Sequence, residues 1–167
     1  LNDEVDRILD MGGLTHFNHY VDSLKAVLDK NYDAVFVGSG APRGRDLDLP
    51  GRQAADANVH IGIDWLSSVA FEHVENIGKK VIVLGGGNTA MDCCRTARRL
   101  GGDEVKVIVR SPFEEMKASP WEKEDAAHEG IPILDNHVPQ EFIVEDGRLV
   151  AMRFDRVKAV YDSNGKR

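Results

Sequence analysis

A run of three glycines between an apolar segment and a helical pattern constrains this chain more than any other feature. The apolar segment is Val81 to Leu84, and Gly85-Gly86-Gly87-Asn88-Thr89-Ala90 follows it directly. The order of strand, glycine turn and helix, with the spacing Gly85-x-Gly87-x-x-Ala90, is that of a dinucleotide-binding fingerprint. Gly85 permits the tight turn, Gly87 lets the backbone approach a pyrophosphate, and Ala90 keeps the helix close to the sheet. We therefore expect a buried strand over 81–84 and a nucleotide site at 85–90.

The segments that follow complete a β-α-β unit. Residues 88–100 have a helical pattern, and Val105-Lys106-Val107-Ile108-Val109 predicts a second strand. Asn88 and Thr89 open the helix, where free N–H groups and the positive end of the helix dipole favour phosphate. The alternative is a strand-turn-helix corner that binds nothing. Three adjacent glycines lose much conformational entropy on folding, which favours the interpretation with a ligand.

The remaining segments predict an α/β fold, with a Rossmann-like, three-layer parallel sheet and an antiparallel β-hairpin excursion. Residues 41–58 hold few apolar side chains and predict a loop, and Glu145-Asp146-Gly147 is a hairpin turn signal. Helices are expected over 3–10, 22–29, 65–74 and 119–130. Asn2 is expected to cap the first of them and Gly12-Gly13 to end it, and Asp22 or Ser23 is expected to start the second. Further strands are expected over 14–18, 33–37, 131–134, 138–144 and 148–161.

Polar residues indicate further features of the helices that precede and follow the second strand. Ser119-Pro120-Trp121-Glu122 predicts a helix start with Ser119 as the cap and Glu122 completing a capping box. The polar face of the helix over 88–100 predicts a solvated surface with local charge pairing. That face carries Asp92, Arg95, Arg98 and Arg99.

Composition restricts the partners of the chain. Its 167 residues carry a formal net charge of −7, which argues against nucleic acid as a ligand. There is no apolar run long enough to cross a membrane and no signal peptide. The first residue is Leu1, so we expect a piece of a larger protein. His16 and His19 lack acidic or thiol companions at ligand spacing, so no metal site is expected.

The two cysteines, Cys93 and Cys94, are adjacent on the expected helix. Neighbouring side chains on a helix point about 100° apart, which is poor geometry for a disulfide. Cys94 shares a face with Ala90, Ala97 and Gly101, which predicts a small core residue. Two unpaired cysteines indicate a reducing compartment, so we expect a cytoplasmic protein.

The end of the second strand bears on the choice between NAD and NADP. An acidic residue there binds the ribose hydroxyls of NAD, whereas a basic residue suits the 2′-phosphate of NADP. The strand ends at Arg110, followed by Ser111, and Lys117 comes a short loop later. A guanidinium, a hydroxyl and an ammonium are suitable phosphate donors, although Glu114 and Glu115 lie in the same loop. We expect NADP(H), with an NAD-dependent Rossmann dehydrogenase as an alternative.

These residues together resemble a known family. Residues 85–93, with Arg95-Thr96-Ala97, closely resemble the glutamate synthase small (β) subunit family, flavoprotein NADPH oxidoreductases of the disulfide-reductase-like superfamily. The reductase part of dihydropyrimidine dehydrogenase carries a similar segment. The resemblance extends over 1–5, 32–41, 49–51 and 110–130. In the family, a second basic residue usually follows the position of Arg110, whereas Ser111 stands here.

The resemblance implies a disulfide-reductase-type nucleotide domain over 51–167, with 1–50 as the segment that leads from an FAD domain. It implies NADPH in this chain, at Gly85, Gly87, Asn88, Thr89, Ala90, Arg110, Ser111 and Lys117, and it implies FAD and iron–sulfur clusters only in the parent protein. The flavin carries the chemistry in such proteins, so no catalytic residue is expected here and the isolated fragment is expected to be inactive. The implied partners are the FAD domain of the parent chain and a large subunit or electron acceptor. The alternative is a docking module in which nucleotide binding is vestigial.

Overall fold

The centre of the fold is a sheet of three parallel strands in the order β1-β2-β3. The computed structural model describes residues 2–40 and 43–163, and the chain divides into two units, Leu1–Gly40 and Ala41–Arg167. Strands β1 (Lys80–Leu84), β2 (Glu104–Ile108) and β3 (Ile133–Leu134) all belong to the second unit. Val83 pairs with Val107, and Ile108 pairs with Leu134. The expected parallel β-α-β arrangement is confirmed.

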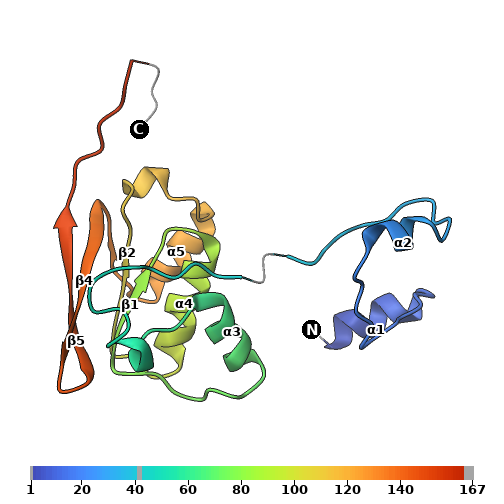
Figure 1. The fold of residues 1–167 in the computed structure, drawn as a ribbon, viewed down its shortest axis with the longest axis horizontal. Helices are drawn as coiled ribbons and strands as arrows, with labels where there is room; N and C mark the ends of the chain where they lie inside the picture. Colours follow the sequence, from blue (N-terminus) through green and yellow to red (C-terminus); the bar gives the residue numbers. More distant parts are fainter. Residues whose placement is uncertain (1, 41–42, 164–167) are drawn as a thin grey trace. The chain divides into compact units, whose positions relative to one another are not determined.

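Two helices connect these strands, and a third packs beside them. Helix α4 (Asn88–Arg99) joins β1 to β2, and α5 (Pro120–His128) joins β2 to β3. Helix α3 (Gly62–Ala70) precedes β1 and contacts α4. Parallel strands require such crossover connections, and their helices cover the face of the sheet. In Figure 1, β1 and β2 lie between these helices and a two-stranded hairpin, which gives the three layers that the sequence predicts.

One face of α4 forms the centre of the hydrophobic core. Met91, Cys94 and Ala97 are almost completely buried, and they pack with Val107 of β2 and Ala126 of α5. Their spacing of three residues keeps them on one side of the helix. The core position predicted for Cys94 is therefore confirmed.

Gly101, predicted on the same face as Cys94, is exposed. Helix α4 has ended before this residue, at its C-cap Leu100, and Gly101 adopts a φ of 94°. The N–H of Gly101 donates to Arg98 O at 3.3 Å, and the N–H of Gly102 donates to Ala97 O at 3.0 Å. These two bonds are those of a Schellman motif, which terminates the helix.

The hairpin consists of β4 (His137–Glu145) and β5 (Arg148–Arg156), paired antiparallel. Asp146 and Gly147 connect them with φ values of 48° and 75°, as a type I′ turn requires. The turn signal at 145–147 is thus confirmed, although β5 ends at Arg156 and not near residue 161 as expected. The segment before α3, which includes the short 3-10 helix η1 (Asp56–Asn58), lies against this hairpin.

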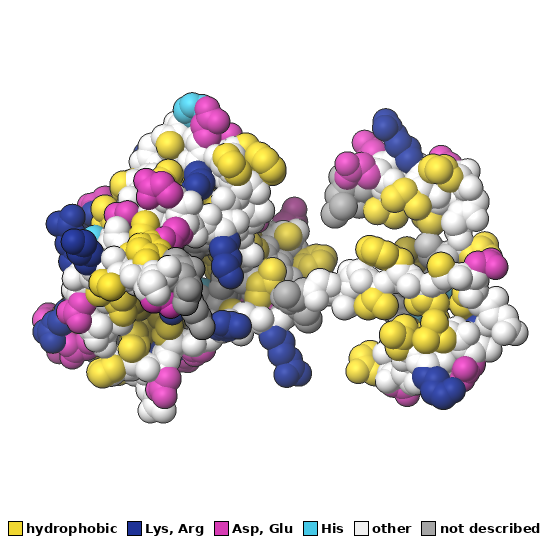
Figure 2. All heavy atoms as spheres, turned by 90° about the horizontal axis from the view of Figure 1, so that it is seen from above, with side chains coloured by type: hydrophobic (Ala, Val, Ile, Leu, Met, Phe, Trp, Pro, Cys, Tyr) yellow, Lys and Arg dark blue, Asp and Glu magenta, His cyan; other side chains and the backbone are white. Residues whose placement is uncertain are grey.

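The first unit contains two short helices and no buried residue among residues 3–40. Helix α1 spans Asn2–Asp10, so Asn2 lies within the helix and does not cap it. Helix α2 spans Leu24–Leu28, and Ser23 caps it by accepting a hydrogen bond from Ala26 N at 3.3 Å. Large apolar side chains are exposed, and many appear in yellow on this unit in Figure 2. They include Leu14, Phe17, Tyr20 and Phe36.

Several sequence predictions about local structure are wrong. The strands expected at 14–18 and 33–37 are absent, because a strand needs a hydrogen-bonded partner and these segments have none within their unit. Strand β1 forms but is only partly buried, with Ile82 41% exposed, because it is an edge strand of the described sheet. Helix α3 ends at Ala70, four residues early, where Glu72 adopts a left-handed φ of 59°.

None of the helices in the described ranges combines the length and the apolar character that crossing a bilayer requires. The longest, α4, has 12 residues. This observation applies to residues 2–40 and 43–163 only.

Arg95 of α4 ties that helix to α5. Its guanidinium lies 2.8 Å from Glu129 Oε1, 3.2 Å from Glu122 Oε2 and 3.0 Å from Asp125 Oδ2. Arg99 also reaches Glu129, at 2.6 Å. The charge pairing expected within α4 is therefore wrong, since these partners belong to α5 and its C-terminus. The hydrogen bond from Arg95 holds the pKa of Glu129 below its usual range.

We expect Arg95→Met to lower the free energy of unfolding at pH 7 by about 1–3 kcal/mol, between the values typical of exposed and buried ion pairs. Because the pKa of Glu129 is lowered on folding, the contribution is present above the ordinary value of 4.5 and is lost as the pH falls through the lowered value. Urea unfolding of both proteins at stepwise lower pH measures this difference. Lys80→Met is the control, because the Lys80–Glu104 pair is largely exposed. An Arg95→Met deficit that stays constant down to about pH 3 would contradict this assignment.

Candidate nucleotide-binding site

The glycine turn leaves β1 through a backbone conformation that favours glycine. Gly85 has a φ of 140°, and its N–H donates to Ile108 O at 3.1 Å. A Cβ built on Gly85 would lie 3.5 Å from the Cβ of Ala90. A small residue at position 90 therefore allows the first turn of α4 to lie close to the end of β1, as the fingerprint requires.

Gly87 is the N-cap of α4, and the space in front of its Cα is open. Its φ and ψ are −102° and 175°, and no side chain caps the helix there. A Cβ built on Gly87 would meet no atom within 4 Å. The carbonyl of Gly87 accepts the N–H groups of Ala90 and Met91 at 3.0 and 3.3 Å. Asn88 and Thr89 are exposed at the helix start, where the dipole of α4 favours an anion.

The loop between β2 and α5 is hydrogen-bonded to this turn. The N–H of Ala118 donates to Gly86 O at 2.9 Å. The N–H of Ser119 donates to Asn88 Oδ1 at 2.8 Å, and Asn88 Nδ2 donates to Ser119 Oγ at 3.3 Å. The side chain of Asn88 thus holds the two loops together, which leaves its backbone N–H for a ligand. No local sequence signal indicates this contact, because the two residues are 31 positions apart.

Ser119 accordingly does not cap α5 with its side chain, contrary to the prediction. Glu122 does not complete a capping box either, because its carboxylate pairs with Arg95. Helix α5 nevertheless begins at Pro120, whose fixed φ suits the first turn of a helix.

The structure brings the remaining predicted residues to the same edge of the sheet. Arg110 and Ser111 come just after β2, and Lys117 directly precedes Ala118, whose N–H is bonded to the glycine turn. Arg110 and Lys117 are exposed, and Ser111 is half-buried. The two acidic residues of the loop, Glu114 and Glu115, are exposed as well. Glu115 accepts a hydrogen bond from the Tyr161 hydroxyl.

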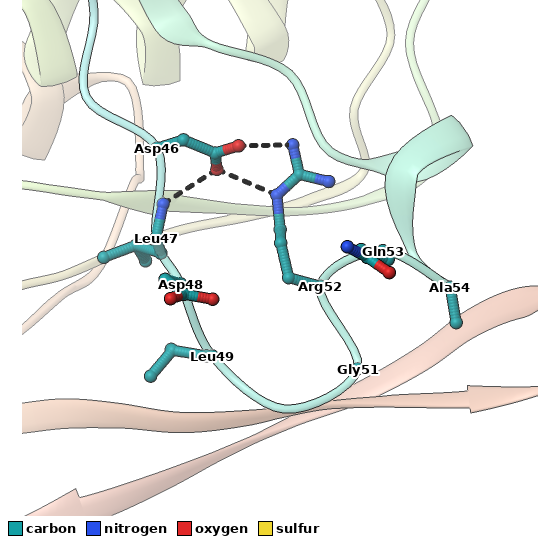
Figure 3. Close-up of a pocket in the computed structure, with 8 residues that line it drawn as sticks. All are labelled: Asp46, Leu47, Asp48, Leu49, Gly51, Arg52, Gln53 and Ala54. Atoms are coloured by element: carbon teal, nitrogen blue, oxygen red, sulfur yellow. Dashed lines mark hydrogen bonds and ion pairs between the residues drawn. The ribbon is translucent and has the colours of Figure 1, made fainter.

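A concave surface elsewhere in the unit, formed by residues 46–54, has a structural role. The guanidinium of Arg52 donates two hydrogen bonds to the carboxylate of Asp46, of 2.8 and 2.9 Å, and Asp46 also accepts the N–H of Leu47 (Figure 3). The hydrogen bond from Arg52 lowers the pKa of Asp46. This pairing shapes the loop whose Pro50 carbonyl accepts the N–H of Phe142 of β4 at 2.9 Å. Asp46 and Arg52 of the loop are thus engaged with each other.

The cysteines offer no reactive group in the folded chain. Cys93 and Cys94 are both buried and unpaired, and burial raises the pKa of each thiol to about 11. Within the described ranges, no group of three or more His, Cys, Asp or Glu side chains could hold a metal ion. This edge of the sheet presents backbone N–H groups, a guanidinium, an ammonium and a hydroxyl, which can all donate to an anion, together with the carboxylates of Glu114 and Glu115.

The chain combines a parallel sheet, a glycine turn and a hairpin after the third strand, and its sequence matches the model of one protein family. Residues 4–166 match the family of pyridine nucleotide-disulphide oxidoreductases, and the chain belongs to that family. It is therefore a member of an oxidoreductase family, and its resemblance to glutamate synthase small subunits is confirmed.

Particular relatives are longer than this chain. The glutamate synthase [NADPH] small chain of Azospirillum brasilense is 32% identical over 177 residues, covering 97% of this chain and 36% of that protein. The NADPH-Fe(3+) oxidoreductase subunit beta of Geobacter sulfurreducens strain PCA is 35% identical over 124 residues, covering 74% of this chain and 18% of that protein. The matched segments thus span 18% and 36% of the lengths of these two relatives.

Solved structures show the same fold. Thioredoxin reductase of Lactococcus lactis matches with a TM-score of 0.56 at 23% identity, over 70% of this chain and 36% of that one. FprA of Mycobacterium tuberculosis, in its complex with NADPH, matches with a TM-score of 0.58 at 18% identity, over 84% of this chain and 46% of that one. The predicted disulfide-reductase-type architecture is confirmed.

We expect neither thiol to react with Ellman's reagent in the folded protein at pH 8. With a pKa of about 11, only about one thiol in a thousand is ionised at that pH, and burial blocks access to the sulfur. In guanidinium chloride, both should react within the mixing time. Rapid labelling of either cysteine in the native protein would contradict the buried placement of this helix face.

Proposed function

We propose that residues 51–167 form the NADP(H)-binding domain of a flavoprotein oxidoreductase like the glutamate synthase small subunit. In this proposal the domain positions NADPH for hydride transfer to an FAD held by the parent protein, and residues 1–50 lead from the FAD domain. The observation that carries the proposal is the open backbone at Gly87, near the loop that carries Arg110, Ser111 and Lys117. The names of the relatives, several of which are NADPH oxidoreductase subunits, support it.

The pyrophosphate is assigned to the glycine turn. Gly85 sets the direction of the turn, and Gly87 leaves room for the phosphate oxygens, since no atom lies within 4 Å of its Cβ position. The backbone N–H groups of Asn88 and Thr89 and the dipole of α4 supply the positive potential. Ala90 acts indirectly, because its small side chain allows the helix to lie against Gly85.

The 2′-phosphate is assigned to the loop after β2. Arg110 offers a planar, permanently charged fork, Ser111 a hydroxyl, and Lys117 an ammonium. No acidic residue stands at the end of β2, where an NAD-specific site would place one. The two cations of the loop suit the more negatively charged nucleotide, although Glu114 and Glu115 belong to the same loop.

The proposal assigns binding and orientation to this chain. NADPH supplies a hydride when it is bound, and a flavin is the acceptor that the family resemblance implies. The described residues present no reactive thiol, since both cysteines are buried with raised pKa values. FAD, iron–sulfur clusters, and a large subunit or electron acceptor are therefore proposed for the parent protein, in a cytoplasmic setting.

We expect the chain to bind NADPH more tightly than NADH, and we expect Arg110→Ala to reduce that preference about tenfold or more. A charge-assisted contact to phosphate contributes about 1.5–3 kcal/mol, which corresponds to a factor of this size. Isothermal titration calorimetry with both nucleotides measures the effect. Lys106→Ala serves as the control, because Lys106 is an exposed residue of β2 outside the loop. Equal affinities of the unmodified chain for both nucleotides would refute the NADP assignment.

We expect Gly87→Val to abolish dinucleotide binding while the fold persists. Valine can adopt the extended backbone conformation of Gly87 without strain, and no atom of the protein lies within 4 Å of its Cβ position, so the fold should tolerate it. The valine side chain would, however, occupy the space proposed for the pyrophosphate. Circular dichroism checks the fold and a calorimetric titration checks binding. Gly78→Val is the matched control, since the Cβ position of Gly78 is equally open but precedes β1. If the Gly87→Val protein binds NADPH normally, the glycine turn is structural only, as a docking module with vestigial binding would require.

A further inference from the structure

A hollow next to the loop after β2 has not been assigned a role. The residues that line it include Pro112, Asn136, Arg156, Lys158 and Tyr161. Pro112 directly follows Ser111, so the hollow lies next in sequence to the proposed 2′-phosphate site. Among the described residues that line it, none is acidic.

Backbone hydrogen bonds link the segment that carries both basic residues to Ser111 through Asn136. The N–H of Asn136 donates to Ser111 O at 3.3 Å, and the N–H of Val157 donates to Asn136 O at 2.8 Å. Arg156 and Lys158 flank Val157 in sequence. The hairpin register also pairs Arg156 with His137, at the start of β4. The end of β5 is thereby carried back to the edge of the sheet at which the nucleotide site lies.

The charges of Arg156 and Lys158 are not neutralised by a neighbour. Within the described part of the chain, neither side chain forms an ion pair, whereas Arg153 on the same strand pairs with Glu141 at 2.7 Å. Two carboxylates next to residues that line the hollow have other partners. Asp135 accepts the N–H of Phe113 and the side-chain amide of Asn136, and Glu115 accepts the Tyr161 hydroxyl.

We propose that Arg156 and Lys158 extend the proposed anion-binding site. They would bind the 2′-phosphate of adenosine together with Arg110. The proposal rests on the proposed function and adds two specificity residues from the hairpin, a region outside the β-α-β unit. Arg110 and Lys117 are already assigned to this phosphate, and Ser111 offers a hydroxyl without a charge, so the two hairpin residues would add further positive charge to a dianion. A guanidinium can grip two phosphate oxygens, and an ammonium adds a point charge.

The hydrogen bond between Tyr161 and Glu115 supports this arrangement. It joins the segment after β5, which lines the hollow, to the loop that carries Lys117. Substitutions at the hollow should therefore alter affinity for the phosphate without altering the glycine turn.

The test uses 2′,5′-ADP and 5′-AMP as probes, because they differ only in the 2′-phosphate. We expect Arg156→Ala with Lys158→Ala to weaken 2′,5′-ADP binding by the 167-residue chain about tenfold or more, and to change 5′-AMP binding less than about twofold. The dependence of 2′,5′-ADP affinity on salt should become shallower. Arg148→Ala with Lys106→Ala is the matched control, since it also removes one arginine and one lysine charge, and neither residue lines the hollow.

The outcomes separate this inference from the proposed function. Unchanged 2′,5′-ADP affinity in the double variant, with NADPH still preferred over NADH, overturns the inference and leaves the proposed function standing. Equal losses for both probes also overturn it. If the unmodified chain binds neither nucleotide, the proposed function and the inference fail together. If Arg156→Ala disturbs the hairpin, the single variant Lys158→Ala is the test, because Lys158 lies after the last strand. A loss of affinity confined to 2′,5′-ADP in that variant supports the inference, and unchanged affinity overturns it.

Discussion

The arrangement of this site depends on the contact between the glycine turn and the loop that precedes α5. Three hydrogen bonds make it, from Ala118 to Gly86 and between Asn88 and Ser119 in both directions. They join the end of β1 to the loop after β2, so the proposed pyrophosphate and 2′-phosphate sites lie on one edge. They also fix the start of α5, which the ion pairs of Arg95 then hold against α4.

The hairpin adds a second connection to the same edge. Ser111, Asn136 and Val157 are linked in series by backbone hydrogen bonds, which join the loop after β2, the residue before β4 and the end of β5. In this way an excursion from the parallel sheet lies next to the proposed nucleotide site. The concave surface over residues 46–54, drawn in Figure 3, lies on the loop that supports β4, and its Asp46 is paired with Arg52. This loop therefore stabilises the hairpin without contributing to the proposed site.

Local patterns were sufficient to predict the β-α-β unit, the hairpin turn at 145–147 and the burial of Cys94, because each depends on residues that are near in sequence. Contacts between distant residues were not predictable. Asn88 and Ser119 are 31 positions apart, and the partners of Arg95 lie 27 to 34 positions away. Apolar runs at 14–18 and 33–37 indicated strands that do not form, since strand pairing depends on a neighbour that those segments lack in their own unit. The partial exposure of β1 has a similar origin, because burial of a strand requires sheet or helix on both sides.

The central claim, that the glycine turn and the loop after β2 bind one nucleotide together, is tested most directly by a titration of the ¹⁵N-labelled chain with NADPH. The account predicts that the amide signals of residues 85–90 and 110–118 shift together along one saturating curve, while those of residues 46–54 stay unchanged. Shifts confined to the loop over residues 46–54, or separate curves for the two predicted segments, would contradict it.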